Sequence, residues 1–421
     1  MAQTLYTPSV PNSTNATINS LPVVLWSTNR FQPQFKYVID VYYSGSGQRL
    51  NRYKITNNAS FDGGAGTIDL APLINPYLIT DQPWTVTGSI YTDSNALNFE
   101  VLLGEEYSTT TSSSVIIYNG YDNAGDPAVS MSILSLYPAV NEYDAGSYNW
   151  DYTPYSNSPL TNQPYFSQAN PKIVYDGDYE TLSFMNPNAL ITSISASIEG
   201  DGGYYAFDYN YTASGSPLPN LLRHIGVGPQ NLADADAGAA SFLSSTNWET
   251  ISYTMYIDGS GINSYWLKNG GCSDYEVTRF AFINKLGVFD YYNITYPVSK
   301  ETKVERESYT RPHTKTENFY SENGIVLQGG PVYNINDRGK IDYYLTYEDN
   351  FEITTEYIGE DDANWLTELF DSPDVFIQGQ YGFEPVIINS TTYNWKTNKK
   401  GQKRFQYKIG FQLANKRINR G

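Results

Sequence analysis

Cysteine and histidine are scarce in this chain of 421 residues, which contains one Cys and two His. The single Cys272 excludes an intrachain disulfide, and one Cys with two His cannot build a thiolate or His-rich zinc centre. We therefore predict no cofactor, no metal site and no redox chemistry. Basic residues are also few, because 26 Lys and Arg stand against 44 Asp and Glu, a net charge of −18. This balance disfavours nucleic acid as a partner, since Lys and Arg supply the affinity for phosphates.

Long apolar runs and targeting signals are missing too. The longest apolar runs, such as 21–26 and 115–118, fall far short of the roughly 20 residues that span a bilayer. Residues 1–20 have no basic start, no apolar stretch and no cleavage site of a secretory signal. We expect no membrane association, and we interpret the first 30 residues as a polar arm.

Tyrosine, glycine and proline are abundant, with 39, 33 and 22 residues. Aromatic residues favour strands, while Gly and Pro favour turns. A chain of this length is also expected to divide into two or three domains. The composition therefore predicts a mainly β, multidomain protein with β-sandwich-like domains and long loops.

Local patterns give the expected layout. Phe35–Tyr43 and Arg49–Ile55, joined by a Ser-Gly turn, predict a hairpin, and Asp361–Asp371 predicts a short helix in a C-terminal α+β unit. Lys300–Glu317 alternates charge and predicts either a two-sided polar strand or a solvated connector. The predicted parts are an N-terminal arm (1–30), a β domain (31–118), an aromatic, Pro- and Asn-rich loop region (119–182), a second β domain (183–299), a charged connector (300–325) and a C-terminal α+β domain with a basic tail (326–421).

The loop region is rich in aromatic residues and has few periodic runs. Long loops of this kind are functional or are ordered by a partner. Two interpretations stay open: the aromatic side chains contact a partner, or they pack on the domain that they flank. The predicted interface residues here are Tyr143, Tyr148, Trp150, Tyr152, Tyr155, Tyr165 and Phe166.

The last 26 residues reverse the charge of the chain. Residues 396–421 hold nine Lys or Arg and no acidic residue, which leaves 17 basic against 44 acidic residues elsewhere, a net charge of −27. A hairpin of Tyr393–Lys400 with Lys403–Phe411 explains this pattern, and contact with an acidic partner can add to it. The predicted interface residues in this segment are Lys399, Lys400, Lys403 and Arg404.

The sequence offers no persuasive catalytic motif. Gly226-Val227-Gly228 lacks the third glycine of a dinucleotide site, and His224 lies among apolar residues, as a core histidine does. The carboxylates at 176–180 and 234–236 lack the remaining ligands of a calcium loop and favour turns. We therefore predict that the protein is not an enzyme and has no catalytic residues. Binding or cleavage of glycans remains the alternative, since aromatic-rich β proteins stack sugars.

The segment Arg279–Tyr296 resembles a stretch found in structural proteins of tailed bacteriophages, including crAss-like and related phages of Bacteroidota. The shared pattern is matched here by Phe282, Asn284, Gly287, Asp290 and Tyr292. Two further segments are similar, FKYVIDVY near the start and Asn364–Ile377 followed by a Lys-rich hairpin near the end. Together the three matches span most of the chain in the expected order.

The resemblance implies a non-enzymatic component of the virion tail, collar or baseplate, made in the bacterial cytoplasm and assembled as a homo-oligomeric ring with other virion proteins. Ring contacts are heterologous, so such a subunit needs two different, complementary surfaces. A polar arm, an aromatic loop and a charge-polarised chain fit that need. From the residues themselves, Gly287 is expected to permit a turn with positive φ, and Asn284 to satisfy turn backbone groups.

Overall fold

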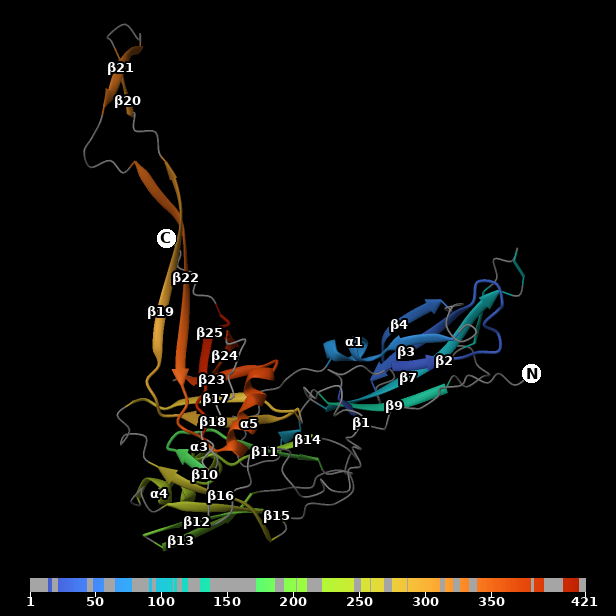
Figure 1. Ribbon diagram of the computed structural model, residues 1–421, viewed down its shortest axis with the longest axis horizontal. Coiled ribbons are helices and arrows are strands. Elements are labelled where there is room, and N and C mark those ends of the chain that lie inside the picture. The colour runs from blue at the N-terminus through green and yellow to red at the C-terminus, as the bar shows by residue number, and fades with distance from the viewer. Residues whose placement is uncertain are drawn as a thin grey trace.

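The computed structural model describes residues 14–16, 22–43, 48–56, 65–77, 91–92, 96–108, 110–111, 116–119, 129–136, 172–185, 193–201, 203–209, 222–245, 251–257, 259–268, 275–285, 287–310, 315–320, 326–332, 339–379, 382–389 and 404–415. Most of these residues form strands that pair into several separate sheets (Figure 1). The predicted mainly β, multidomain fold is thereby confirmed. No helix among the described residues has the length and apolar character needed to cross a bilayer.

The first unit is a six-stranded sheet with a short helical cover. Its strands are β1 (Thr14–Ala16), β9 (Val129–Leu136), β7 (Ala96–Ser108), β3 (Lys36–Tyr43) and β4 (Arg49–Thr56) in that order, with β8 (Ile116–Asn119) beside β7. The strand pair β2 (Pro22–Leu25) and β5 (Gly66–Asp69), α1 (Ala71–Ile74) and the 3-10 turn η1 (Asn75–Tyr77) complete the unit. The predicted hairpin is β3–β4, whose buried Tyr37 and Ile39 pack with Ile74 of α1. Leu70 is the N-cap of this helix, and the carboxylate of Asp69, one residue earlier, accepts a hydrogen bond from the Ala71 N–H at 3.0 Å.

The second unit is a five-stranded sheet covered by two short helices. Its order is β10 (Lys172–Tyr175), β16 (Ser260–Lys268), β15 (Ser252–Ile257), β12 (Ile194–Gly200) and β13 (Gly203–Asp208). A second, three-stranded sheet consists of β11 (Thr181–Met185), β14 (Leu222–Gly226) and β6 (Tyr91–Thr92). The helices α3 (Pro229–Ala235) and α4 (Ala237–Ser245) bury Leu232 and Leu243 in the same core as Ile198 of β12. His224 is fully buried there, with Ser183 Oγ 2.6 Å from its Nδ1, as expected of a core histidine.

The third unit is a seven-stranded sheet with α5 (Glu360–Asp371) on one face. Its order is β18 (Phe289–Ile294), β17 (Thr278–Ile283), β23 (Val375–Gly379), β24 (Gly382–Ile388), β25 (Lys408–Leu413), β22 (Lys340–Thr354) and β19 (Ser299–Thr310). Alternate residues of β17 face opposite cores: Phe280 and Phe282 pack with α5, whereas Ala281 and Ile283 join a core that includes Phe376. Residues 361–371 are helical as predicted.

Three predicted boundaries are corrected by the strand pairing. Residues 172–182, placed in the loop region, form β10 and the start of β11. Strands β17 and β18, placed in the second domain, pair with strands of the third unit. The predicted connector at 300–325 holds most of β19 and the strand β20 (Lys315–Tyr320), which pairs with β21 (Val326–Val332). Of the two interpretations of Lys300–Glu317, the two-sided polar strand thus agrees with residues 300–310. The unit of β17 depends on its pairing with β23, which lies far along the chain and leaves no local signal. In β19, which is exposed on both faces, the apolar alternation of a half-buried strand is missing.

Candidate functional site

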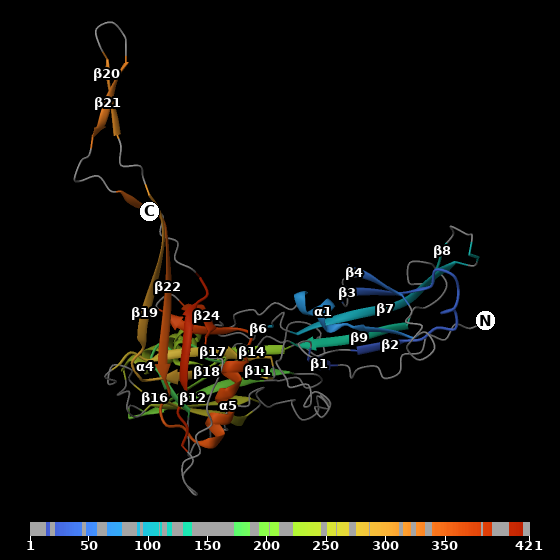
Figure 2. The same cartoon turned by 45° about the horizontal axis from the view of Figure 1, so that its top comes forward.

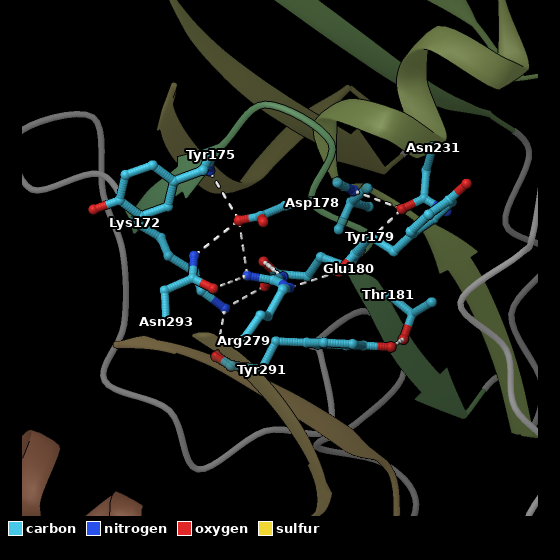
Figure 3. Close-up of polar contacts among 12 residues, drawn as sticks. Lys172, Tyr175, Asp178, Tyr179, Glu180, Thr181, Asn231, Arg279, Tyr291 and Asn293 are labelled. Atoms are coloured by element: carbon cyan, nitrogen blue, oxygen red, sulfur yellow. Dashed lines mark hydrogen bonds and ion pairs between the residues drawn. The ribbon is translucent and has the colours of Figure 1, made fainter. Parts of the chain in front are cut away.

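A buried ionic cluster joins the second and third units. It comprises Lys172, Asp178, Glu180, Arg279 and Asn293, which we call the ionic junction (Figure 3). The Arg279 guanidinium lies 3.0 Å from Asp178 Oδ2 and 3.0 Å from Glu180 Oε2, and it is 2% exposed. Lys172 pairs with the other oxygen of Glu180. Because residues 172–180 belong to the second unit and Arg279 to β17, these contacts hold the two sheets together.

Neutral groups complete the ionic junction. The Asn293 amide donates to Asp178 at 2.8 Å and its oxygen accepts from Arg279 at 2.8 Å. Arg279 also donates to the Tyr179 carbonyl at 3.0 Å and lies 5.0 Å above the ring centre of Tyr291. The cluster therefore satisfies its buried charges with one another, as buried ions require.

Burial and ion pairing shift the pKa values of the ionic junction in opposite directions. Burial lowers the pKa of the Lys172 ammonium, while the Glu180 carboxylate acts to raise it. Burial likewise raises the pKa of the Asp178 carboxyl, and the Arg279 charge acts to lower it. The two cations, Lys172 and Arg279, pair with the two carboxylates, Asp178 and Glu180, so these four charges sum to zero. We interpret it as a structural joint that fixes the sheet carrying β19 and β22, and not as a reaction centre.

Carboxylates elsewhere in the described ranges do not gather into metal sites. No group of three His, Cys, Asp or Glu side chains comes together there in a way that could hold a metal ion. Asp178 and Glu180, from the carboxylate run at 176–180, bind Arg279. Asp236, from the second run, accepts hydrogen bonds from Tyr205 Oη at 2.5 Å and from the Ala239 N–H at 2.8 Å.

The core tyrosines give a prediction on alkaline stability. Burial raises the pKa of Tyr209, Tyr253 and Tyr265 above the usual value, so in the unfolded chain these phenols lose their protons first, near pH 10. Their contribution to stability is present below that pH and decreases as pH rises above it. We expect the free energy of unfolding to fall steadily above about pH 10, and Tyr209→Phe to make that fall less steep. Urea unfolding at a series of pH values tests this, and an unchanged slope in the variant would contradict it.

The strands β19 and β22 form a ribbon that leaves the third unit. They pair along their full length, from Ser299↔Glu352 to Thr310↔Lys340, whereas β25 pairs with β22 only over 350–354. Residues 340–349 of β22 thus extend past β25, and Figures 1 and 2 both show the ribbon projecting from the sheet with β20–β21 beyond its end. An isolated two-stranded ribbon is marginally stable in water.

The two faces of the ribbon differ in charge. On one face, Lys300 pairs with Asp349 at 2.8 Å and Arg306 with Asp342 at 3.4 Å. The register adds Lys340 to this face, which then has a net charge of +1. The register and the alternation of side chains place acidic and aromatic residues together on the other face. We call it the tyrosine–carboxylate face, and it comprises Glu301, Lys303, Glu305, Glu307, Tyr309, Tyr343, Tyr344 and Glu348. A bulge between Glu307 and Ser308 brings both Tyr343 and Tyr344 opposite Glu307.

A hydrogen bond and a ring contact agree with this assignment of the tyrosine–carboxylate face. Tyr343 Oη donates to Glu307 at 2.7 Å, and its ring lies 6.1 Å from that of Tyr309. The three tyrosines are 48%, 64% and 51% exposed at positions 309, 343 and 344. Exposed, clustered tyrosines are typical of protein interfaces. The face carries four Glu and one Lys, a net charge of −3.

The resemblance motif forms the β17–β18 hairpin and its contact with α5. The Gly287 backbone has φ +82°, and Asn284 Oδ1 accepts a hydrogen bond from the Val288 N–H at 3.3 Å; these are the turn roles expected from the sequence. Trp365 of α5 donates to Asp290 at 2.8 Å. The Trp365 ring packs against Phe282 at 5.6 Å and Tyr292 at 5.7 Å. The motif residues therefore act in folding, at the base of the sheet that carries the ribbon.

Replacing Gly287 tests the turn. An alanine there must hold a left-handed backbone, which costs about 1–2 kcal/mol, so Gly287→Ala should lower the free energy of unfolding by that amount. Gly261 has no positive φ and has ordinary space for a Cβ, which makes Gly261→Ala the matched control with a smaller effect. Urea unfolding of both variants gives the comparison, and equal losses would contradict the role of the turn.

The predicted interface residues fall mostly outside the described part of the chain. This holds for Tyr143, Tyr148, Trp150, Tyr152, Tyr155, Tyr165, Phe166, Lys399, Lys400 and Lys403. Arg404 is described and exposed, next to Phe405, which bridges to Ile358. The tyrosine–carboxylate face was not predicted from the sequence. The charge alternation of Lys300–Glu317 predicted either a two-sided polar strand or a solvated connector, and pairing with 340–354 cannot be read from either segment alone.

No protein-family model and no curated protein matches the chain.

Proposed function

We propose that this chain is a non-enzymatic structural subunit of a tailed-bacteriophage virion. It would assemble through protein contacts into a ring of the tail, neck or baseplate. The observation that carries the proposal is the ribbon: 12 residues of β19 paired with β22, exposed on both faces and extended past its own sheet. An arm whose paired strands lie mostly in solvent serves contact with a neighbour. The phage virion is proposed because the motif in β17–β18 resembles phage structural proteins. Its residues are Phe282, Asn284, Gly287, Asp290 and Tyr292.

Locating the chain in phage particles tests this proposal. We expect mass spectrometry of purified particles to detect it at a fixed copy number, and antibody labelling to place it at the tail or neck. The control is a replication protein of the same phage, which should be absent. Particles that lack the chain would contradict the structural role.

Glycan binding by the second unit is the alternative. Trp266 of β16 is 41% exposed, with the Lys268 ammonium 5.7 Å from its ring centre, and Ile173, its partner on β10, is 40% exposed. An exposed indole on a sheet surface offers a stacking platform for a sugar ring. Glycan-array binding that Trp266→Ala abolishes and Tyr275→Ala preserves would favour this alternative. No binding by the full chain would count against it.

A further inference from the structure

We propose that the tyrosine–carboxylate face of the ribbon binds a second copy of this chain, through the Lys- and Arg-rich segment 396–421 of that copy. This inference rests on the proposed function and names the two surfaces of the repeated contact. A ring needs two different surfaces that complement each other. The chain has one strongly basic segment, and the ribbon presents an acidic, aromatic face.

Charge complementarity is the first argument. The tyrosine–carboxylate face has a net charge of −3, and Lys303, its one cation, already pairs with Glu305 at 2.7 Å. Segment 396–421 has nine basic and no acidic residues. One of them, Lys408, lies in β25 and pairs with Glu352 of its own copy at 2.7 Å, so the other eight carry the charge complementarity. Lys and Arg also interact favourably with the faces of tyrosine rings, so the exposed Tyr343 and Tyr344 suit the same partner as the carboxylates.

The shape of the face is the second argument. Where the ribbon meets the end of β25, a hollow of about 170 Å³ opens beside the face, and Glu305, Glu348 and Ile387 are among its lining residues. A partner can therefore contact a recess lined by carboxylates near β25 and the exposed tyrosines farther along the ribbon.

The area of the tyrosine–carboxylate face is small for a stable dimer, which favours a ring over an isolated pair of copies. Twelve residues of strand extend about 40 Å, and two strands are about 10 Å wide, so the face offers about 400 Å². A standard interface buries about 800 Å² on each partner. A single contact of half that size is weak, whereas a closed ring makes many of them act together.

Charge reversal on each surface tests the inference. One variant carries Glu301→Lys, Glu305→Lys and Glu307→Lys, and the other carries Lys399→Glu, Lys400→Glu and Lys403→Glu. Each alone should weaken self-association about tenfold or more, because like charges then face each other. The matched control for the ribbon is Thr302→Lys, Val304→Lys and Ser308→Lys, which adds three cations to the opposite face and should assemble like the natural chain.

Mixing the variants identifies the partner. The ribbon variant then carries two basic surfaces and the variant of segment 396–421 two acidic ones, so an equimolar mixture should assemble with the two variants in alternation. Both sets combined in one chain should also restore large assemblies. Native mass spectrometry measures both. If the combined chain assembles but the mixture gives no complex, the contact lies within one chain and the inference fails. It also fails if the ribbon variant assembles normally, whereas a natural chain that stays monomeric refutes the proposed function itself.

Discussion

Replacing Arg279 with Met should lower the free energy of unfolding by about 3–5 kcal/mol. Arg279 is buried and pairs with both Asp178 and Glu180. Methionine fills part of the space but leaves two carboxylates in the interior without this cation, and burying an uncompensated charge is strongly unfavourable. Urea unfolding followed by tryptophan fluorescence measures the loss.

An exposed ion pair provides the control for Arg279. Arg306 pairs with Asp342 on the ribbon, where the two side chains are 64% and 36% exposed. Such pairs contribute at most about 1 kcal/mol, so Arg306→Met should change stability little. Equal losses in the two variants would show that the ionic junction does not join the units.

Replacing Trp365 with Ala should cost a similar amount, about 3–5 kcal/mol. The side chain is 4% exposed and lies between α5 and the sheet, in contact with Phe282 and Tyr292. Alanine leaves a cavity there, and the buried Asp290 loses the hydrogen bond from the indole N–H.

Trp365→Phe separates packing from hydrogen bonding. Phenylalanine keeps much of the ring but cannot donate to Asp290, so we expect a smaller loss of about 1–3 kcal/mol. Thermal or urea unfolding of the three proteins gives the comparison. If Trp365→Ala unfolds like the natural chain, α5 does not anchor the sheet that carries the ribbon.

The sequence predicted local elements better than their assembly. The β3–β4 hairpin follows from two aromatic, β-branched segments and a Ser-Gly turn, and α5 follows from its paired apolar residues and acidic first turn. These signals lie within one segment. In contrast, Arg279 reaches Asp178 and Glu180 across about 100 positions of the chain, and no local pattern encodes such a pairing.

The ribbon was recognisable only as a polar segment. Its strands carry charged residues on both faces, so the apolar alternation that marks a half-buried strand is missing. The partner strand, 340–354, contains tyrosines that are ordinary for a β protein. Only the register brings Tyr309, Tyr343 and Tyr344 together on one face.

The mass of the chain in solution, with and without the ribbon, tests the central claim most directly. Deleting residues 304–347 and joining Lys303 to Glu348 through Asn-Gly keeps the base of the ribbon, because these two residues are cross-strand partners and Asn-Gly favours a tight hairpin. Analytical ultracentrifugation compares the two proteins, with circular dichroism to establish that both fold. We predict that the full chain forms multi-subunit assemblies and the shortened chain stays monomeric. Equal assembly of both proteins, or a full chain that remains a monomer, would contradict the account.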